Sequence, residues 1–168
     1  LDDQQKEIRT YSSKDKEGPA TEKGFNQFAW NLYHKELEQP EAGFILWNGS
    51  TSPVLAAPGK FTANITIDKQ LVSYPFEIIA DPNFKVSNAD LKEQEQFLLQ
   101  VAGSFKEIMN TLKGAKEIKS QIAVIQKKTK DSTFIASAKA VNDMLTKIEE
   151  ALHQTKAKSG QDVLNFPI

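Results

Sequence analysis

Residues 61–79 read FTANITIDKQLVSYPFEII, and this stretch decides how the first half of the chain folds. Apolar and polar side chains alternate along residues 61–67, as they do in a strand with one buried face. Residues 68–70 form a tight connection, and a second strand follows over residues 71–79. Pro75 cannot donate a hydrogen bond to a neighbouring strand, so it places the returning strand at a sheet edge or at a bulge. The stretch therefore predicts a β-hairpin.

The chain before this hairpin shows the same period of two. Residues 6–13 make one candidate strand and residues 24–34 make another. Several short strands separated by turn formers are typical of a β-sandwich, so we predict an immunoglobulin-like or fibronectin-like β-sandwich over residues 1–86. The side chains expected in its interior are Phe28, Trp30, Leu32, Phe61, Ile65 and Ile67.

At residue 87 the apolar period changes from 2 to about 3.6. Ser87 and Asp90 have the spacing of a helix N-terminal cap, and the periodic run continues to about Lys128. A second helix is expected from Thr133 to about Lys156. Its apolar positions have the spacing of a coiled-coil seam: Phe134, Ala138, Val141, Leu145, Ile148 and Leu152. The short connection between the helices predicts an antiparallel helical hairpin over residues 87–168.

The two predicted helices differ in length, at roughly 60 and 36 Å. The shorter helix would leave an apolar stripe of the longer one uncovered. An apolar tail follows at residues 163–168, and we expect it to lie over that stripe. The uncovered positions are Leu91, Leu98, Val101 and Phe105.

The composition excludes several classes of function. The 168 residues include no cysteine, so disulfides, thiolate nucleophiles and Cys-ligated metals are ruled out. The formal net charge of -1 does not favour nucleic-acid binding. No apolar run approaches the roughly 18 residues of a membrane span. The chain starts at Leu1 without an initiator Met, and we expect it to be a fragment of a larger protein or a trimmed mature chain.

Catalytic chemistry finds little support in the residue pattern. His34 and His153 lie far apart in the sequence, and neither belongs to a metal-binding spacing. Glycoside hydrolysis uses a pair of carboxyl side chains, and the sequence offers Glu36, Glu38 and Glu41 as candidates. Acidic residues beside a proline are usually just solvated. We predict no catalytic residue, no metal and no cofactor.

Exposed aromatic rings offer an alternative function, because such rings stack on sugars. Trp47 precedes a loop-forming run, so its ring either caps the sandwich or is presented to solvent. The candidate stacking residues for a glycan are Trp47, Phe44 and Tyr33. A carbohydrate-binding module is therefore the alternative to a purely structural role.

Several stretches together resemble the C-terminal region of large bacterial proteins with Asp-box (bacterial neuraminidase) repeats, a sortilin-like group classed as glycosyl hydrolases. The matching stretches, in order along the chain, are residues 7–11, 24–32, 57–63, 81–82 with 89–91, and 160–168. The Asp-box pattern itself is absent from the sequence. The chain is therefore similar to the part that follows the repeats.

The resemblance implies an accessory role in an exported protein. In such proteins the repeats form β-propellers upstream, and any hydrolytic site is expected there. The resemblance thus implies a non-catalytic accessory module that contacts the β-propellers of its parent chain, located in the periplasm or at the cell surface. A further protein partner, or self-association through the helical hairpin, is also expected. No catalytic residue is carried over to this chain.

Overall fold

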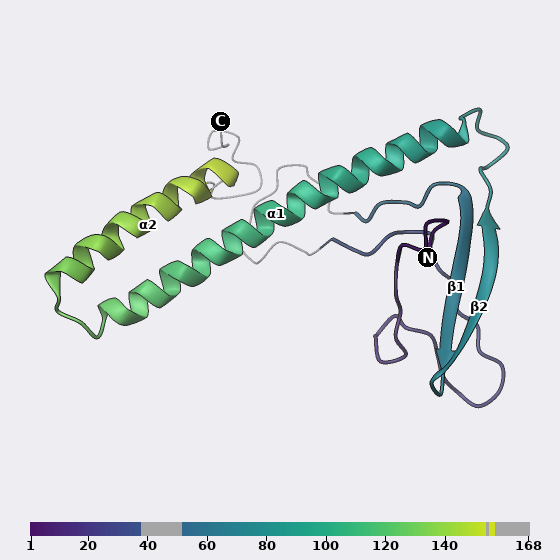
Figure 1. Cartoon of the computed structure of the whole chain (residues 1–168), viewed down its shortest axis with the longest axis horizontal. Helices are drawn as coiled ribbons and strands as arrows, with labels where there is room; N and C mark the ends of the chain where they lie inside the picture. Colours follow the sequence, from purple (N-terminus) through teal and green to yellow (C-terminus); the bar gives the residue numbers. More distant parts are fainter. Residues whose placement is uncertain (38–51, 154, 157–168) are drawn as a thin grey trace. The chain divides into compact units, whose positions relative to one another are not determined.

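The computed structural model describes residues 1–37, 52–153 and 155–156. Its elements in chain order are β1 (Gly59–Ile67), β2 (Gln70–Ile78), α1 (Asn88–Gln126) and α2 (Ser132–Leu152) (Figure 1). Residues 1–37 and 52–101 group into one compact unit, and the described residues from 102 onward belong to a second. Helix α1 contributes to both units. The domain boundary expected after residue 86 stays a prediction.

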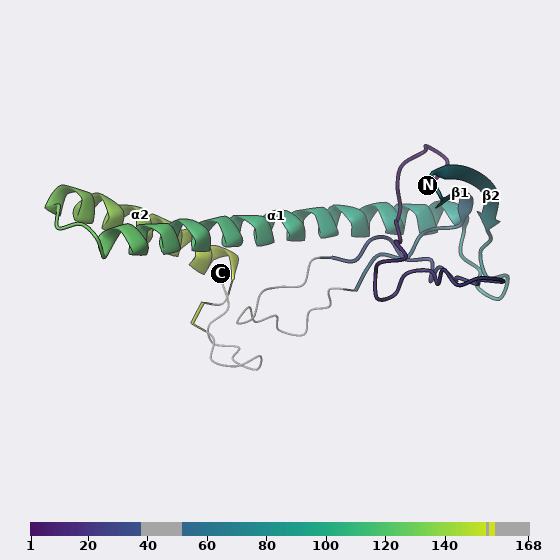
Figure 2. The same cartoon turned by 90° about the horizontal axis from the view of Figure 1, so that it is seen from below.

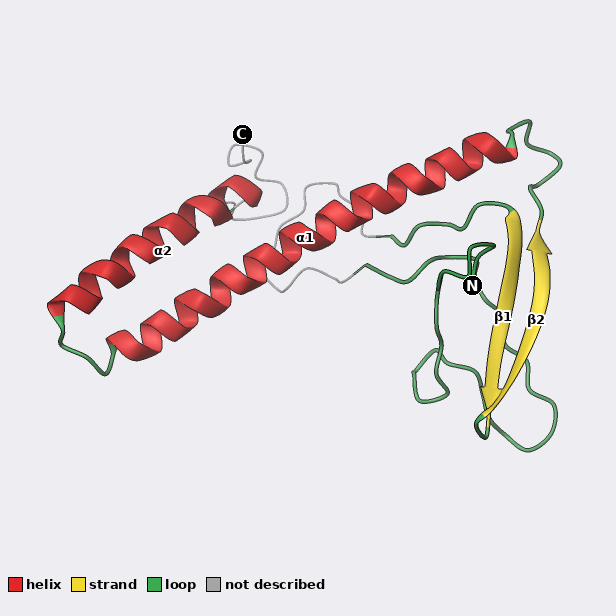
Figure 3. Cartoon of the chain, viewed as in Figure 1, coloured by secondary structure: helices red, strands yellow, loops and turns green. Residues whose placement is uncertain are grey.

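The predicted hairpin is confirmed as a two-stranded antiparallel ribbon. The two strands lie side by side in Figure 3, and their register runs from Gly59 opposite Ile78 to Ile67 opposite Gln70. Asp68 and Lys69 form the two-residue turn, with φ of 48° and 68°. Two successive residues at positive φ define a type I′ turn, whose twist matches that of the strands it joins. Because the sheet has two described strands, β2 leaves one edge unpaired, as its proline predicts.

The register separates the ribbon into two chemically different faces. Residues directly opposite each other in an antiparallel pair project from the same face. The apolar face carries Phe61, Ala63, Ile65, Ile67, Val72, Tyr74, Phe76 and Ile78. The opposite face carries Lys60, Thr62, Asn64, Thr66, Leu71, Ser73, Pro75 and Glu77. The alternation in the sequence therefore produces an amphipathic ribbon.

The core of the first unit lies against one end of the apolar face. Ile8, Ala56 and Phe61 are buried there, and Trp30 and Ile78 pack against them. Ile8 and Ala56 come from segments without regular structure. The core is thus built by coil segments laid on a ribbon.

The predicted β-sandwich is wrong. Within residues 1–37 and 52–86, the sheet consists of β1 and β2, and the only further strand pairing is an isolated bridge between Tyr33 and Leu55. Residues 6–13 and 24–34 have the expected alternation, but apart from this bridge they pair with no strand of the described chain. Leu32 adopts φ 65°, in the left-handed region, which breaks the extended course of its segment. Of the expected interior side chains, Phe28, Leu32, Ile65 and Ile67 are exposed.

Both helices are present where the period of 3.6 predicts them. The Ser87 Oγ accepts a hydrogen bond from the Asp90 N–H at 3.1 Å, which confirms the predicted cap of α1. Helix α1 then continues without interruption through Gly103 and Gly114 (Figure 2). At the start of α2, the Asp131 carboxylate accepts from the Thr133 N–H at 2.8 Å. Local capping thus defines both helix starts.

The long antiparallel helical hairpin predicted for residues 87–168 is not shown, and that part of the fold prediction is also corrected. Among the described elements, β1 and β2 are the only pair whose Cα atoms approach within 8 Å. Two positions of the predicted seam, Val141 and Ile148, remain exposed. Ala138 of the predicted seam is buried, but with Val141 and Ile148 exposed a continuous coiled-coil seam is not shown. The tail at residues 163–168 lies outside the described residues.

The type I′ turn predicts that Lys69→Gly stabilises the ribbon. A non-glycine residue at positive φ costs roughly 1 kcal/mol, and glycine removes most of that cost. Part of the gain is offset by the greater freedom of glycine in the unfolded chain. We expect a net gain of about 0.5 kcal/mol in the free energy of unfolding, measured by urea denaturation. Lys60→Gly, the same change inside β1, should lower this free energy, and stabilisation by both changes would contradict the turn assignment.

Candidate functional site

An aromatic cluster covers the apolar face at its Gly59–Ile78 end. The Trp30 ring meets Phe61 edge-on, with centroids 5.9 Å apart, and Phe76 at 6.3 Å. Phe61 and Phe76 stack on each other across the strands at 5.7 Å. The indole N–H of Trp30 donates to the carbonyl oxygen of Tyr33 at 2.9 Å, so the polar atom of the ring is satisfied. Trp30, expected in the interior, is indeed packed against the core.

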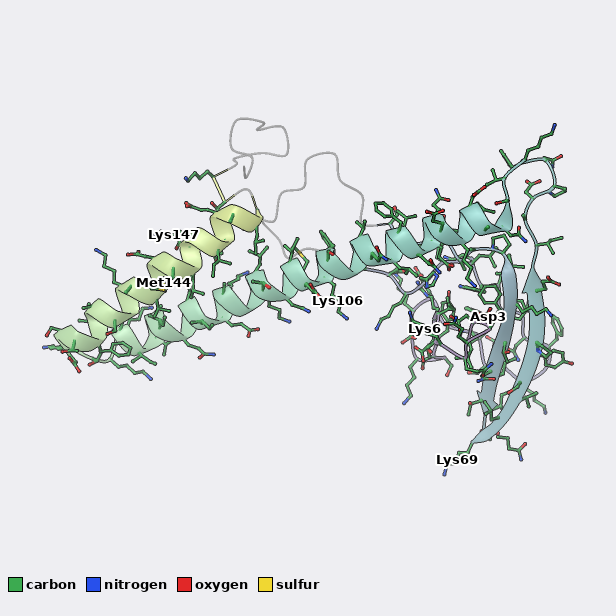
Figure 4. All side chains as sticks on the ribbon, turned by 45° about the horizontal axis from the view of Figure 1, so that its top comes forward. Asp3, Lys6, Lys69, Lys106, Met144 and Lys147 are labelled. Carbon is green, nitrogen blue, oxygen red and sulfur yellow. The ribbon has the colours of Figure 1, made fainter. Side chains whose placement is uncertain are left out.

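The other end of the same face is left uncovered. Beyond the aromatic cluster lie Ile65, Ile67, Val72 and Tyr74, which we call the open apolar patch. Their exposed fractions are 49%, 65%, 52% and 66% respectively. The turn that closes this end carries Lys69, whose side chain points away from the tip of the ribbon (Figure 4). The ribbon is therefore covered at one end and open at the other.

A partly buried polar pair attaches the start of α1 to the rest of the first unit. The His34 Nε2 lies 2.6 Å from the Glu95 Oε1, and the two side chains are only 13% and 14% exposed. The backbone N–H of His34 donates to the carbonyl oxygen of Val54 at 2.8 Å. His34 is thereby held between a coil segment and the helix. This geometry gives the histidine a structural role.

Arg9 extends the same polar cluster. Its Nη1 donates to the carbonyl oxygen of His34 at 3.0 Å, and its Nη2 donates to the Glu36 Oε1 at 2.8 Å. The hydrogen bond to Glu36 raises the pKa of Arg9, against the opposing effect of burial. The Glu36 carboxylate is thus engaged in an ion pair, which does not favour a role in acid–base catalysis.

The second unit contains a polar contact between α1 and α2. The Lys119 Nζ donates to the Thr146 Oγ1 at 2.7 Å and also bonds to the Glu149 carboxylate. His153 ends α2, where its N–H donates to the Glu149 carbonyl oxygen at 2.9 Å. Burial lowers the pKa of His153, and the nearby Glu149 carboxylate opposes this shift only in part.

The residues predicted to bind a glycan are not brought together by the described structure. Tyr33 is partly buried and forms the isolated bridge with Leu55. Phe44 and Trp47 lie outside the described residues, as do Glu38 and Glu41. The stacking platform therefore stays a prediction.

Two further properties concern only the described part of the chain. No group of three or more His, Asp or Glu side chains there is arranged to hold a metal ion. Neither described helix is long and apolar enough to cross a membrane.

Comparison of the chain with protein-family models, curated proteins and solved structures finds no match. The case for a function therefore depends on the geometry and on the residue pattern.

The open apolar patch was missed by sequence reasoning because Ile65 and Ile67, two of its four residues, were assigned to a sandwich interior. Alternation identifies which face of a strand is apolar, but it does not reveal whether a second sheet covers that face. The pairing of His34 with Glu95 was missed because the two residues lie 61 positions apart. No local pattern indicates a contact at that separation.

The aromatic cluster predicts a large cost for Trp30→Ala. The substitution removes both edge-on contacts and leaves a cavity over Phe61, so we expect a loss of about 3 kcal/mol in the free energy of unfolding. Chemical denaturation followed by circular dichroism measures this loss. Phe25→Ala is the control, because Phe25 is 92% exposed. Equal effects of the two changes would contradict the cluster.

The lowered pKa of His153 predicts a pH-dependent stability of the helical unit. In the unfolded chain His153 takes up a proton as the pH falls through about 6.5, whereas the folded state takes it up at lower pH. Stability is therefore highest above this pH and falls as the pH decreases, until the folded state is also protonated. Thermal unfolding of wild type and His153→Gln between pH 5 and 8 tests this. The difference between the two proteins should change over that range, and a constant difference would contradict the assignment.

Proposed function

We propose that the chain is a non-catalytic interaction module of a larger exported protein. The observation that carries this proposal is the open apolar patch. A two-stranded ribbon with one apolar face is marginally stable in water unless that face is covered. Here the aromatic cluster covers only one end, and four large side chains remain exposed at the other. A partner surface would complete the burial.

The arrangement of ionisable groups supports a binding role over a catalytic one. The polar side chains described above serve to connect segments: Glu95 bonds to His34, Glu36 to Arg9, and Glu149 to Lys119. General acid–base catalysis requires such groups to be directed at a substrate. These three carboxylates are instead held by other side chains of the fold, Glu36 and Glu149 in ion pairs and Glu95 in a hydrogen-bonding contact with His34.

The resemblance of the sequence to the region that follows Asp-box repeats supplies the wider context of the proposal. The parent protein would be glycosyl hydrolase-like and located outside the cytoplasm. Its upstream β-propeller domains would be the partner of the open apolar patch. The hydrolytic function, where present, would belong to the parent and not to this module.

Binding of the chain to the β-propeller domains of the parent protein tests the interaction. Val72→Asp introduces a charge on the open apolar patch, and burying an unpaired carboxylate is costly, so we expect affinity to fall at least 10-fold in titration calorimetry. Ser73→Asp is the matched control, since the neighbouring side chain lies on the opposite face of the ribbon. Equal affinities for the two variants would reject this surface.

A second experiment separates the module from an enzyme and from a carbohydrate-binding domain. The isolated chain is assayed on a panel of aryl glycosides and for retention on immobilised polysaccharides. We expect neither turnover nor retention. Turnover would reject the non-catalytic function, and retention abolished by Trp47→Ala would favour glycan binding instead.

A further inference from the structure

The connection between α1 and α2, at residues 127–131, carries a concentration of positive charge (Figure 1). Over residues 118–142 the sequence has five lysines and one acidic residue, although the whole chain has a net charge of -1. The acidic residue is Asp131, whose carboxylate is used as the N-terminal cap of α2. This part of the second unit is therefore basic.

Four of these five lysines are free to meet an external partner. Lys119 is bound to Glu149 on α2. The other four are exposed and make no ion pair with another described residue: Lys127, Lys128, Lys130 and Lys139. The last turn of α1 contains no basic residue, so the lysines of the connection lie beyond the turn in which a cation best stabilises a helix C-terminus. Their charge is directed to solvent.

Exposed aliphatic side chains flank the same connection. Val124 and Ile125 lie in the last turn of α1, and Ile135 lies in the first turn of α2. Their exposed fractions are 50%, 47% and 43% respectively. At 1.5 Å per residue, each lies within roughly 5 Å of the end of its helix, measured along the helix axis. Apolar side chains of segments that bind a bilayer surface enter it by roughly 5–10 Å, so all three are within reach of such a surface.

Lysine combined with aliphatic side chains fits a lipid surface better than a protein or a nucleic acid. The cores of protein interfaces are depleted in lysine and enriched in arginine and aromatic residues. Nucleic acids are bound through arginine and through exposed rings that stack on bases. Residues 118–142 contain no arginine, and their one aromatic residue, Phe134, is half-buried. At an anionic bilayer, by contrast, each lysine near the surface raises the affinity about 5-fold.

We propose that the connection between α1 and α2 binds the surface of an anionic lipid bilayer. The three lysines at residues 127–130 contact the charged headgroups, and the aliphatic side chains on either side of them enter the boundary between headgroups and acyl chains. Two weak signals, one electrostatic and one apolar, combine in this way at many peripheral membrane sites. The contact belongs to the second unit and does not involve the open apolar patch of the first.

Co-sedimentation of the full chain with vesicles tests the electrostatic part. The vesicles contain equal parts of phosphatidylserine and phosphatidylcholine, and vesicles of phosphatidylcholine alone are the comparison. We expect binding to the anionic vesicles only, and weaker binding as the salt concentration rises. Replacing Lys127, Lys128 and Lys130 together by glutamine should lower the affinity at least about 10-fold. The matched control replaces Lys14, Lys16 and Lys23, three exposed lysines of the first unit, and should have a much smaller effect.

A fluorescent label tests the apolar part. Because the chain contains no cysteine, a single introduced cysteine directs a thiol-reactive nitrobenzoxadiazole label to one position. We expect the label on Ile135→Cys to emit more strongly and at shorter wavelength when anionic vesicles are added, because it leaves water. Met144→Cys is the control: Met144 is 65% exposed but lies roughly 18 Å along α2 from its start (Figure 4). Emission from position 144 should not change.

Three outcomes would overturn the proposal. The first is equal binding to both kinds of vesicle, or none to either. The second is an equal effect of the two lysine replacements, or an equal change in emission at positions 135 and 144. The third is binding to a duplex oligonucleotide that the first lysine replacement abolishes, without binding to vesicles, which would assign the basic connection to nucleic acid.

Discussion

The contact of Trp30 with Phe61 and Phe76 is the interaction on which the first unit depends. Burial of apolar area supplies most of the stability of a small fold, and an isolated two-stranded ribbon buries very little of it. The indole ring joins a coil segment to both strands at once. Ile8 and Ala56 add the remaining buried side chains around Phe61. The small core explains why stability should be concentrated at one end of the ribbon.

Polar contacts connect this core to α1. His34 follows Trp30 closely in the same coil segment. Its side chain contacts Glu95 in the third turn of α1. Arg9 follows the buried Ile8 and holds the His34 carbonyl group. A partly buried polar pair contributes little net stability, but removing one partner is costly because the other loses its hydrogen-bonding contact. The pair of His34 and Glu95 therefore determines where α1 attaches, and it adds little to the free energy of unfolding.

The sequence predicts the local elements well and their assembly poorly. The hairpin at residues 59–78, the edge position of Pro75 and the Ser87 cap all follow from local rules of backbone geometry and hydrogen bonding. The β-sandwich does not follow from local rules, because the alternation over residues 24–34 is equally compatible with an extended segment outside any sheet. The positive φ of Leu32 also interrupts the extended backbone of that segment. The helical period likewise identifies α2 without revealing whether Val141 and Ile148 meet a partner. For the candidate site, alternation identifies the apolar face, while its partial coverage depends on contacts from distant segments.

Pro75 also bears on solubility. A ribbon with an exposed apolar face and two open edges can stack with identical ribbons without limit, which is how amyloid-like fibrils grow. Each added ribbon in such a fibril needs an edge to receive it and another to offer to the next. β2 lacks an N–H donor at Pro75, and the backbone groups of Thr62 on β1 are already paired with Leu1, so neither edge offers an unbroken row of free backbone groups to such an addition. Each of these two features therefore works against the edge-to-edge addition that would turn the exposed apolar face into an aggregation hazard.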